Sequence, residues 1–345
     1  MSQLTVISPW GPAAASHRVR VLQWLRHLEL DYHLVDYAGT RVNHPQVLAR
    51  SPLRVLRAER RLRSSGLARE GTLFLHKEAS PFSRGKLEEG LLLRAERSVY
   101  DFDDALQWDY TGSPVRRYFG KSTKCLAAVR SADVVIAGSH MLGEWAAQWA
   151  SEVVVIPTCV EPADYEVKKS YRIDGRPRLL WIGTPMMEGQ IDVAARAMLE
   201  VSRRTGAVLR IISSGDGDFG SLAPIVERVE WSPAVAQAAV AEADIAIAPL
   251  IDGIYESGKC AYKILQYAAA GVPVVGSPIG ANRSVLNLLG APAATDTDSW
   301  VDGLMSWLER SPQERAAAGA RARAVVEQHY SYAAWSSTWR STVGV

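Results

Sequence analysis

Residues 256–284, "ESGKCAYKILQYAAAGVPVVGSPIGANRS", carry the clearest indication of the fold class. Its helical part is predicted to run to Ala270 and to stop at Gly271, with Pro273 just beyond. The apolar run that follows, "VPVVGSP", has the composition of a strand that is buried on both faces, as in a parallel sheet. A helix that leads into such a strand through one glycine turn belongs to a βαβ unit, so this stretch predicts an α/β protein.

The rest of the chain follows the same alternation of helical patterns and apolar runs. Short apolar runs alternate with helical patterns, and we predict strands at residues 4–10, 32–37, 72–77, 98–104, 133–139, 152–158, 178–184, 208–214, 226–232, 244–250 and 272–278. The pattern predicts two Rossmann-like, doubly wound α/β domains, with the carboxyl ends of their strands facing a cleft.

The domain boundary is predicted in the polar segment "CVEPADYEVKKSYRIDGRPR" (159–178), which separates the two series of strands. We therefore expect an N-terminal domain at 1–160 and a C-terminal domain at 161–325. The remaining tail, 326–345, carries Tyr330, Tyr332, Trp335 and Trp339, which need a surface to bury against. We expect it to form a last helix that packs across the domain junction.

Composition excludes several classes. The net charge of +2 gives no global argument for nucleic-acid binding. The three cysteines, Cys125, Cys159 and Cys260, lie far apart and form no CxxC pair, which favours a reducing compartment and no structural zinc. The N-terminus does not resemble a signal peptide, and no stretch nears the roughly 18 apolar residues of a spanning helix. We expect a cytoplasmic protein or one at a membrane surface.

One segment is strongly basic. Residues 41–69 hold eight arginines against a single acid, Glu59, and apolar residues lie between them. This pattern predicts a basic amphipathic surface for an anionic membrane or an acidic acceptor. A solvated helix and loop is the plain alternative.

Lysines at a predicted helix start raise a question, because the helix dipole disfavours cations there. Lys259 and Lys263 occupy that place, and an anion bound by the free N–H groups would outweigh the cost. Gly258 lets the backbone approach a ligand closely, and Gln266 offers the hydrogen bonds that a ribose needs. Two surface lysines on a solvated helix are the alternative.

The segment "YDFDDALQ" places three carboxylates, Asp101, Asp103 and Asp104, at the end of a strand. Three carboxylates this close repel one another, so they cannot all ionise cheaply without a partner. A hard metal ion is one reading, but we prefer Asp103 or Asp104 bound to sugar or acceptor hydroxyls. In the alternative, one of the acids caps the next helix and another pairs with an arginine.

After the first predicted strand, "SPWGPAAASHRVR" offers a further site. Gly11 permits close approach of a ligand, and Arg18 could grip an anionic acceptor. Ser16 is the predicted N-cap of the helix. A plain helix start is equally compatible. For His76 and Lys77, which end another strand, we favour a structural role.

These segments resemble a known family. "SGKCAYKILQYAAAGVPVVGSPIGANRSVL" is similar to the donor-site segment of GT-B glycosyltransferases of the family 4 (group 1) type, and "SVYDFDDALQ" resembles a YDxDDA segment of one branch. "LLWIGTP" resembles the first strand and loop of the donor domain, and this resemblance makes Gly183 and Thr184 candidate donor-binding residues. The resemblance extends over most of the chain.

The resemblance implies transfer of a sugar from a nucleotide diphosphate, with retention of configuration and without a metal. It implies that Lys259, Ser257, Gly258 and Lys263 hold the diphosphate. It further implies that Glu256 contacts the donor sugar, Trp231 stacks on the base and Gln266 touches the ribose, while Asp101, Gly11 and Arg18 lie on the acceptor side. For Trp231, packing in the core is an equally plausible alternative.

The chain departs from the family pattern in two places. Gln266 and Gly258 stand where the family commonly has two glutamates, and "GTPMMEGQ" (183–190) lacks the usual arginine and lysine. Two alternatives therefore stay open: a nucleotide-sugar epimerase or phosphorylase on the same fold, and a non-catalytic scaffold. A dehydrogenase is disfavoured because no G-x-G-x-x-G follows the first strand, and hydrolases lack their G-x-S-x-G elbow.

Overall fold

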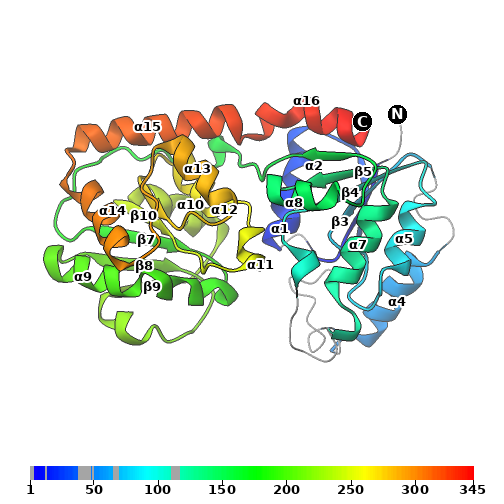
Figure 1. Cartoon of the computed structure of the whole chain (residues 1–345), viewed down its shortest axis with the longest axis horizontal. Coiled ribbons are helices and arrows are strands. Elements are labelled where there is room, and N and C mark those ends of the chain that lie inside the picture. Colours follow the sequence, from blue (N-terminus) through cyan, green and yellow to red (C-terminus); the bar gives the residue numbers. More distant parts are fainter. Residues whose placement is uncertain (1–3, 12–13, 38–47, 49, 65–69, 110–116) are drawn as a thin grey trace. The chain divides into compact units, whose positions relative to one another are not determined.

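The computed structural model describes residues 4–11, 14–37, 48, 50–64, 70–109 and 117–345. The chain folds into two compact units (Figure 1). The first comprises the described residues of Met1–Thr158 together with Ser257–Cys260 and Trp335–Val345. The second comprises Cys159–Glu256 and Ala261–Ala334.

A six-stranded parallel sheet forms the centre of the first unit, in the order β2-β1-β3-β4-β5-β6. Its strands are β1 (Leu4–Ser8), β2 (Tyr32–Asp36), β3 (Thr72–His76), β4 (Arg97–Phe102), β5 (Val134–Ala137) and β6 (Val153–Val155). The strand order reverses between β1 and β3, which is where such sheets bind ligands, beyond the carboxyl ends of the strands.

Helices cover this sheet. They are α1 (Ala15–His17), the π-turn η1 (Arg18–Leu22), α2 (Gln23–His27), α4 (Pro52–Leu62), α5 (Lys86–Leu92), η2 (Leu106–Trp108), α7 (Lys121–Ser131) and α8 (His140–Ala146). The end of α16 (Tyr332–Val343) also belongs here, because Trp339 is buried and stacks on Trp24 at 5.5 Å between ring centroids. The part of the aromatic tail from Trp335 on thus supplies core to the first unit, whereas Tyr330 packs against the core of the second.

The second unit has a five-stranded parallel sheet in the order β11-β10-β7-β8-β9, with β7 (Arg178–Ile182), β8 (Val208–Ile212), β9 (Val226–Val229), β10 (Ile245–Ala248) and β11 (Val274–Gly276). Counted along this unit the order is 5-4-1-2-3, which is that of the Rossmann fold, with its switch point between β7 and β10. Each predicted strand of the chain overlaps one of these eleven, so the predicted α/β class with two parallel sheets is confirmed.

Two hydrophobic layers enclose the second sheet, as a doubly wound fold requires. One lies under α10 (Pro233–Glu242), α12 (Tyr262–Ala269), α13 (Ala281–Leu289) and α15 (Pro312–His329). The other lies under η4 (Pro185–Ala194), α9 (Ala195–Thr205), η5 (Gly220–Ile225) and α14 (Thr297–Glu309). The short elements η3 (Pro162–Asp164) and α11 (Ile254–Ser257) complete the set.

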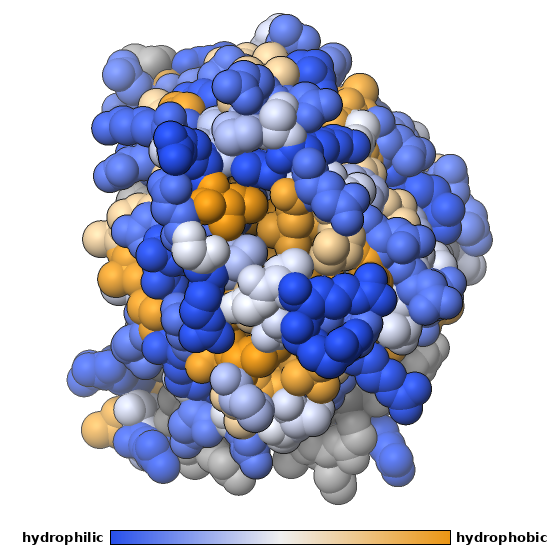
Figure 2. Space-filling view, turned by 90° about the vertical axis from the view of Figure 1, so that its left-hand side faces the viewer, coloured by the Kyte–Doolittle hydropathy of each residue, from blue (hydrophilic) through white to orange (hydrophobic). Residues whose placement is uncertain are grey.

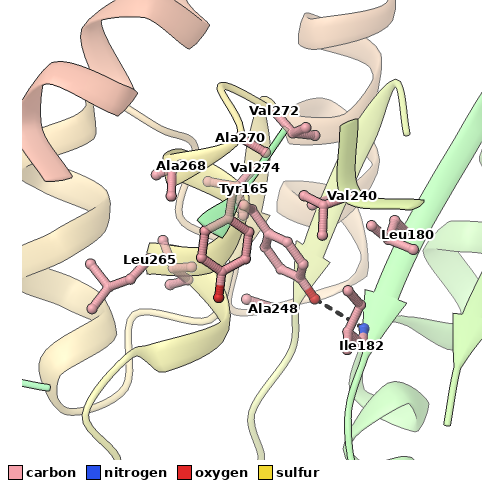
Figure 3. Close-up of a cluster of buried hydrophobic side chains, with 14 of the residues drawn as sticks. Tyr165, Leu180, Ile182, Val240, Ala248, Leu265, Ala268, Ala270, Val272 and Val274 are labelled. Carbon is pink, nitrogen blue, oxygen red and sulfur yellow. Dashed lines mark hydrogen bonds between the residues drawn. The ribbon is translucent and has the colours of Figure 1, made fainter. Parts of the chain in front are cut away.

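A buried tyrosine fixes the end of β7. The Ile182 N–H donates to the Tyr267 hydroxyl at 3.1 Å, within a cluster that includes Tyr165, Val240 and Leu265 (Figure 3). The loop that leaves β7 therefore starts from a rigid position.

On the side that carries α9 and α14, hydrophilic residues predominate and hydrophobic ones form separate patches (Figure 2).

Two local expectations were wrong. Ser16 does not cap its helix, because the N-cap is Ala14 and the helix is broken by a π-turn before α2. Lys259 does not begin a helix either: α12 starts at Tyr262, after Ala261 in the left-handed region at φ 56°. A non-glycine residue in this conformation costs of order 1–2 kcal/mol, and the resulting turn separates Ser257–Cys260 from α12.

Candidate functional site

The first candidate site lies at the switch point of the first unit. Strands β3 and β4 are paired so that His76 stands opposite Asp101, and both strands end here. Lys77 follows His76 in the left-handed region at φ 62°. Strained residues of this kind gather at functional sites. The register between β3 and β4 therefore brings His76 and Lys77 close to the "DFDD" segment.

Asp101 is buried at the bottom of this site. Its side chain is ion-paired to Arg20 and accepts a hydrogen bond from His76 Nδ1 at 2.8 Å. Burial alone would raise the pKa of Asp101, but the Arg20 guanidinium and His76 lower it below the ordinary carboxyl value. Arg20, which the π-turn carries inward, also donates to the Ile156 carbonyl at 2.9 Å. The sequence left open that one carboxylate of "DFDD" pairs with an arginine, and Asp101 does so.

Asp103 and Asp104 lie nearer the surface and share Lys77. Its Nζ lies 2.6 Å from Asp103 and 2.5 Å from Asp104, and the Lys77 side chain is 2% exposed. Burial would lower the pKa of Lys77, but the two carboxylates raise it, so the ammonium stays charged. Sequence reasoning missed Lys77 as the centre of this cluster; its place directly after the strand beside Asp101 was the available signal.

Lys259 contributes a second cation. Its Nζ lies 2.7 Å from Asp104 Oδ1. Burial would raise the pKa of Asp104, but Lys259 and then Lys77 lower it well below the usual value. The backbone that comes close to Gly258 is that of Ala105, because a Cβ on Gly258 would lie 2.8 Å from the Ala105 nitrogen. Glycine is therefore required here for the segment to pack on "DDA".

Ser16 joins the cluster from the start of α1. Its Oγ lies 3.0 Å from His76 Nε2 and 3.1 Å from Asp103 Oδ1. Ser16, His76 and Asp101 thus form the hydrogen-bonded chain of a serine hydrolase. However, Arg20 already pairs with Asp101, and the Asp103 carboxylate would repel an alkoxide formed on Ser16. The geometry favours a hydrogen-bonding role for Ser16 over hydrolysis.

The predicted acceptor-side residues occupy the same region. Gly11 is buried in the loop after β1, and its carbonyl accepts from Ala14 N–H at 3.1 Å. Arg18 is half-buried on the π-turn. Neighbouring His17 is buried, and both of its ring nitrogens lack a hydrogen-bond partner among the described residues. Burial and then the charge of His76 lower the pKa of His17 to about 3, so it is neutral.

The second candidate site lies at the switch point of the second unit. Gln190, in η4 after β7, accepts from Ile251 N–H after β10 at 2.6 Å and donates to Glu256 Oε1 at 3.5 Å. Gln190 thus joins the two loops that flank the switch point. The sequence pattern of residues 183–190 did not predict this role for Gln190.

Other predicted donor residues surround these loops. A Cβ on Gly183 would lie 2.2 Å from the Trp181 ring, so only glycine fits before Thr184. Lys263 Nζ lies 5.3 Å from the centre of the same ring. Gln266 donates to the Tyr165 hydroxyl at 3.0 Å, and Trp231 packs half-buried against the cluster under α10 and α12. Ser257 ends α11.

A cation at this edge escaped the sequence reasoning. Arg228 of β9 pairs with Glu188 at 3.0 Å and donates to the carbonyls of Gly215 and Gly217. It therefore ties together the loops after β7 and β8. Burial would raise the pKa of Glu188, but Arg228 lowers it, so both groups are charged. In the sequence, only the alternation of side chains along "VERV" indicated where the Arg228 side chain would point.

The described residues contain no group of three or more His, Cys, Asp or Glu side chains arranged to hold a metal ion. Asp103 and Asp104 instead face ammonium groups. Whether the reaction needs a metal stays a prediction.

Comparisons with known proteins bear on both sites. Residues 176–310 match the family model of glycosyl transferases group 1, and the sequence has no match among curated proteins. Among solved structures, the chain resembles HepE from Anabaena in complex with UDP and glucose, with a TM-score of 0.66, 13% identity and coverage of 100% of this chain and 99% of that one.

Two further structures are similar over the whole chain. WaaG, a glycosyltransferase involved in lipopolysaccharide biosynthesis, gives a TM-score of 0.65 at 14% identity over 99% of this chain and 100% of that one. An E. coli structure described as trehalose-6-phosphate bound with UDP-2-fluoro glucose gives 0.63 at 13%, over 99% of each chain. These likenesses show the GT-B fold that the sequence predicted. They do not test the YDxDDA branch.

Proposed function

We propose that this protein is a glycosyltransferase that moves a sugar from a nucleotide diphosphate to an acceptor hydroxyl, with retention of configuration. The observation that carries the proposal is the group 1 match over residues 176–310, which contains every strand of the second sheet and both loops of its switch point. The solved structures with the same fold include complexes with UDP and with UDP-glucose.

In the second unit, the loops after β7 and β10 would receive the donor. Gly183 and Thr184 bring backbone close to the diphosphate, and Glu256 binds hydroxyls of the donor sugar. Gln266 contacts the ribose, and Trp231 stacks on the base. Support comes from Gln190, which holds the loop of Gly183 and the loop of Glu256 together.

In the first unit, Asp103 and Asp104 would bind the reacting hydroxyls, while Lys259 would neutralise the departing diphosphate. The bond from the anomeric carbon to the diphosphate breaks as the acceptor oxygen bonds to that carbon. The acceptor proton then passes to the departing diphosphate oxygen. The protein supplies position and charge, which are large terms in group transfer. Support comes from the carboxylates of Asp103 and Asp104, which are 14% and 20% exposed.

A panel of nucleotide sugars tests the function. Thermal shift identifies the donor, because a ligand at 100 times its dissociation constant stabilises by roughly 2.7 kcal/mol. Transfer to an acceptor, with product of the same anomeric configuration, supports the proposal. Conversion of the donor without acceptor supports the epimerase alternative. Binding without turnover across donors and acceptors supports a non-catalytic protein, which the pairing of Lys259 with Asp104 would suit.

Removal of metal ions should leave activity unchanged. Lys77 and Lys259 already balance Asp103 and Asp104, so a cation is not required there. Initial rates in buffer with and without EDTA measure this. Loss of activity in EDTA that magnesium or manganese restores would contradict the expectation.

The basic segment supports a second part of the proposal, contact with an anionic membrane. Within it, α4 exposes Leu53 (70%) and Leu56 (47%) beside the exposed Arg57 and Arg60. Glu59 is half-buried, accepts from Tyr37 and Ser80, and is ion-paired to the exposed Arg63. The outer face of α4 is therefore apolar and cationic, as in helices that lie on membrane surfaces. Arg41 and Arg69 lie outside the described residues.

Binding to anionic vesicles should be salt-sensitive. No helix in the described part of the chain has the length and hydropathy to span a bilayer, so the contact would be at the surface. Each basic residue contributes about 1 kcal/mol near an anionic surface. We expect Arg57→Gln/Arg60→Gln to reduce sedimentation with phosphatidylserine vesicles and to leave nucleotide binding intact.

The matched control is Arg203→Gln/Arg204→Gln on α9, which removes the same charge from an exposed helix. Sedimentation unchanged by the α4 pair, or none at low salt, contradicts the membrane contact. A higher KM for acceptor alone in the α4 variant would instead support an acidic acceptor.

A further inference from the structure

A cavity of about 420 Å³ opens at the amino-terminal edge of the second sheet. Arg178 begins β7 and Asp244 directly precedes β10, and the Arg178 N–H donates to Asp244 Oδ2 at 2.8 Å. Nucleotides bind such sheets at the opposite, carboxyl edge. The cavity is therefore separate from the proposed donor site, and its volume is that of a small-molecule site.

The cavity wall has an excess of positive charge. It contains the cations Lys168, Lys169, Arg172, Arg176 and Arg178 and the acids Glu166, Asp174, Glu242 and Asp244. Glu242 is neutralised from outside the wall by Arg210, at 2.8 Å. The remaining wall thus has five cations and three acids.

Lys168 is the buried member of this set. Its side chain is 5% exposed, and its Nζ lies 3.9 Å from Asp244 Oδ1 and 3.4 Å from the Ala241 carbonyl. Both contacts are long for an ammonium group, which also lies 5.5 Å from the centre of the Tyr171 ring. Burial lowers the pKa of Lys168; Asp244 opposes this, and Arg315 and Arg178 add to the lowering.

Arg315 adds a second buried charge nearby. It is 4% exposed and donates to main-chain carbonyls, among them that of Tyr171 at 2.7 Å. Asp244 and Glu314 both act on Arg315, and Asp244, at 3.9 Å, is the carboxylate that pairs with Lys168. A buried charge with a distant counter-ion is costly, and an anion in the cavity would reduce that cost.

We propose that this cavity binds a small phosphate-bearing anion, with Lys168, Lys169 and Arg178 as its cationic contacts. Arginine and lysine suit phosphate oxygens, and Ser170 adds a hydroxyl to the wall. No aromatic ring is among the residues that line the cavity, although the Tyr171 ring lies beside Lys168. The proposed ligand is inorganic phosphate or a sugar phosphate, and binding of a nucleotide to this wall is an outcome of the test.

Calorimetry on the full chain tests the site, with inorganic phosphate and glucose 6-phosphate as probes in a low-chloride buffer. Lys168→Met and Arg178→Gln should each weaken binding roughly tenfold, the scale of one lost charge-assisted contact. Arg204→Gln is the matched control, because Arg204 is exposed on α9 and pairs with Glu200 away from the cavity. Arg178 is exposed, so its variant should fold even if Lys168→Met does not.

The outcomes separate the possibilities. Equal affinity for both probes identifies the phosphate group as the ligand, and tighter binding of glucose 6-phosphate identifies a sugar phosphate. UDP binding should be the same in wild type and Arg178→Gln, which distinguishes this site from the donor site. The proposal is wrong if millimolar phosphate gives neither a heat of binding nor a rise in melting temperature. It is also wrong if Arg178→Gln and Arg204→Gln lose the same amount of affinity for the probes.

Discussion

Lys259→Ala is expected to lower turnover at saturating donor by roughly 10², the scale of one lost transition-state charge contact. Lys259 is 24% exposed and lies 2.7 Å from Asp104, so its ammonium is held at the surface of the carboxylate cluster. Asp104 keeps Lys77 at 2.5 Å in the variant, so no buried carboxylate is orphaned and the fold should persist. Steady-state kinetics with the identified donor and acceptor measure the effect.

Lys121→Ala is the matched control. Lys121 is 25% exposed and pairs with Asp109 at 2.6 Å, so its burial and pairing are like those of Lys259. Lys259→Arg, which keeps the charge, should retain most of the turnover. Near-wild-type turnover of Lys259→Ala, or an equal loss in Lys121→Ala, would remove the proposed role of Lys259.

Asp101→Asn is expected to destabilise the first unit by about 3–5 kcal/mol. The change keeps the side-chain shape but leaves Arg20, which is 1% exposed, without its counter-charge. Thermal unfolding measures this, and the midpoint should fall by roughly 2–4 °C per kcal/mol for a unit of this size. If Asp101 served the acceptor alone, the variant would keep its stability and lose turnover.

Replacing both partners separates charge from packing. Arg20→Met/Asp101→Leu should recover much of the lost stability, because it leaves neither charge buried. The folded-state pKa of Asp101 is lowered, so its contribution to stability is present above the unfolded carboxyl pKa of about 3.9 and is lost as pH falls through the lower folded value. The difference between wild type and Asp101→Asn should therefore shrink in that acid range. A constant difference down to strong acid would contradict this account.

Much of the fold could be predicted from local sequence. Continuous apolar runs such as "VPVVGSP" are buried on both faces of a sheet, and the pattern alone placed all eleven strands. Helix ends were less certain, because they depend on single residues. Ser16 has the chemistry of an N-cap, yet α1 begins before it, and its hydroxyl contacts His76 and Asp103.

The class of the fold, the resemblance to group 1 glycosyltransferases and the charged segments can all be recognised in the amino-acid sequence. Which charged side chains meet depends on the packing of the folded chain. Strand register sets His76 beside Asp101, and the turn at Ala261 assigns Lys259 to Asp104 and not to α12. Periodicity along a chain reports which face of an element is buried. It holds no information on contacts between residues as distant as Lys77 and Asp104 or Asp104 and Lys259, because those follow from how strands and loops pack in three dimensions.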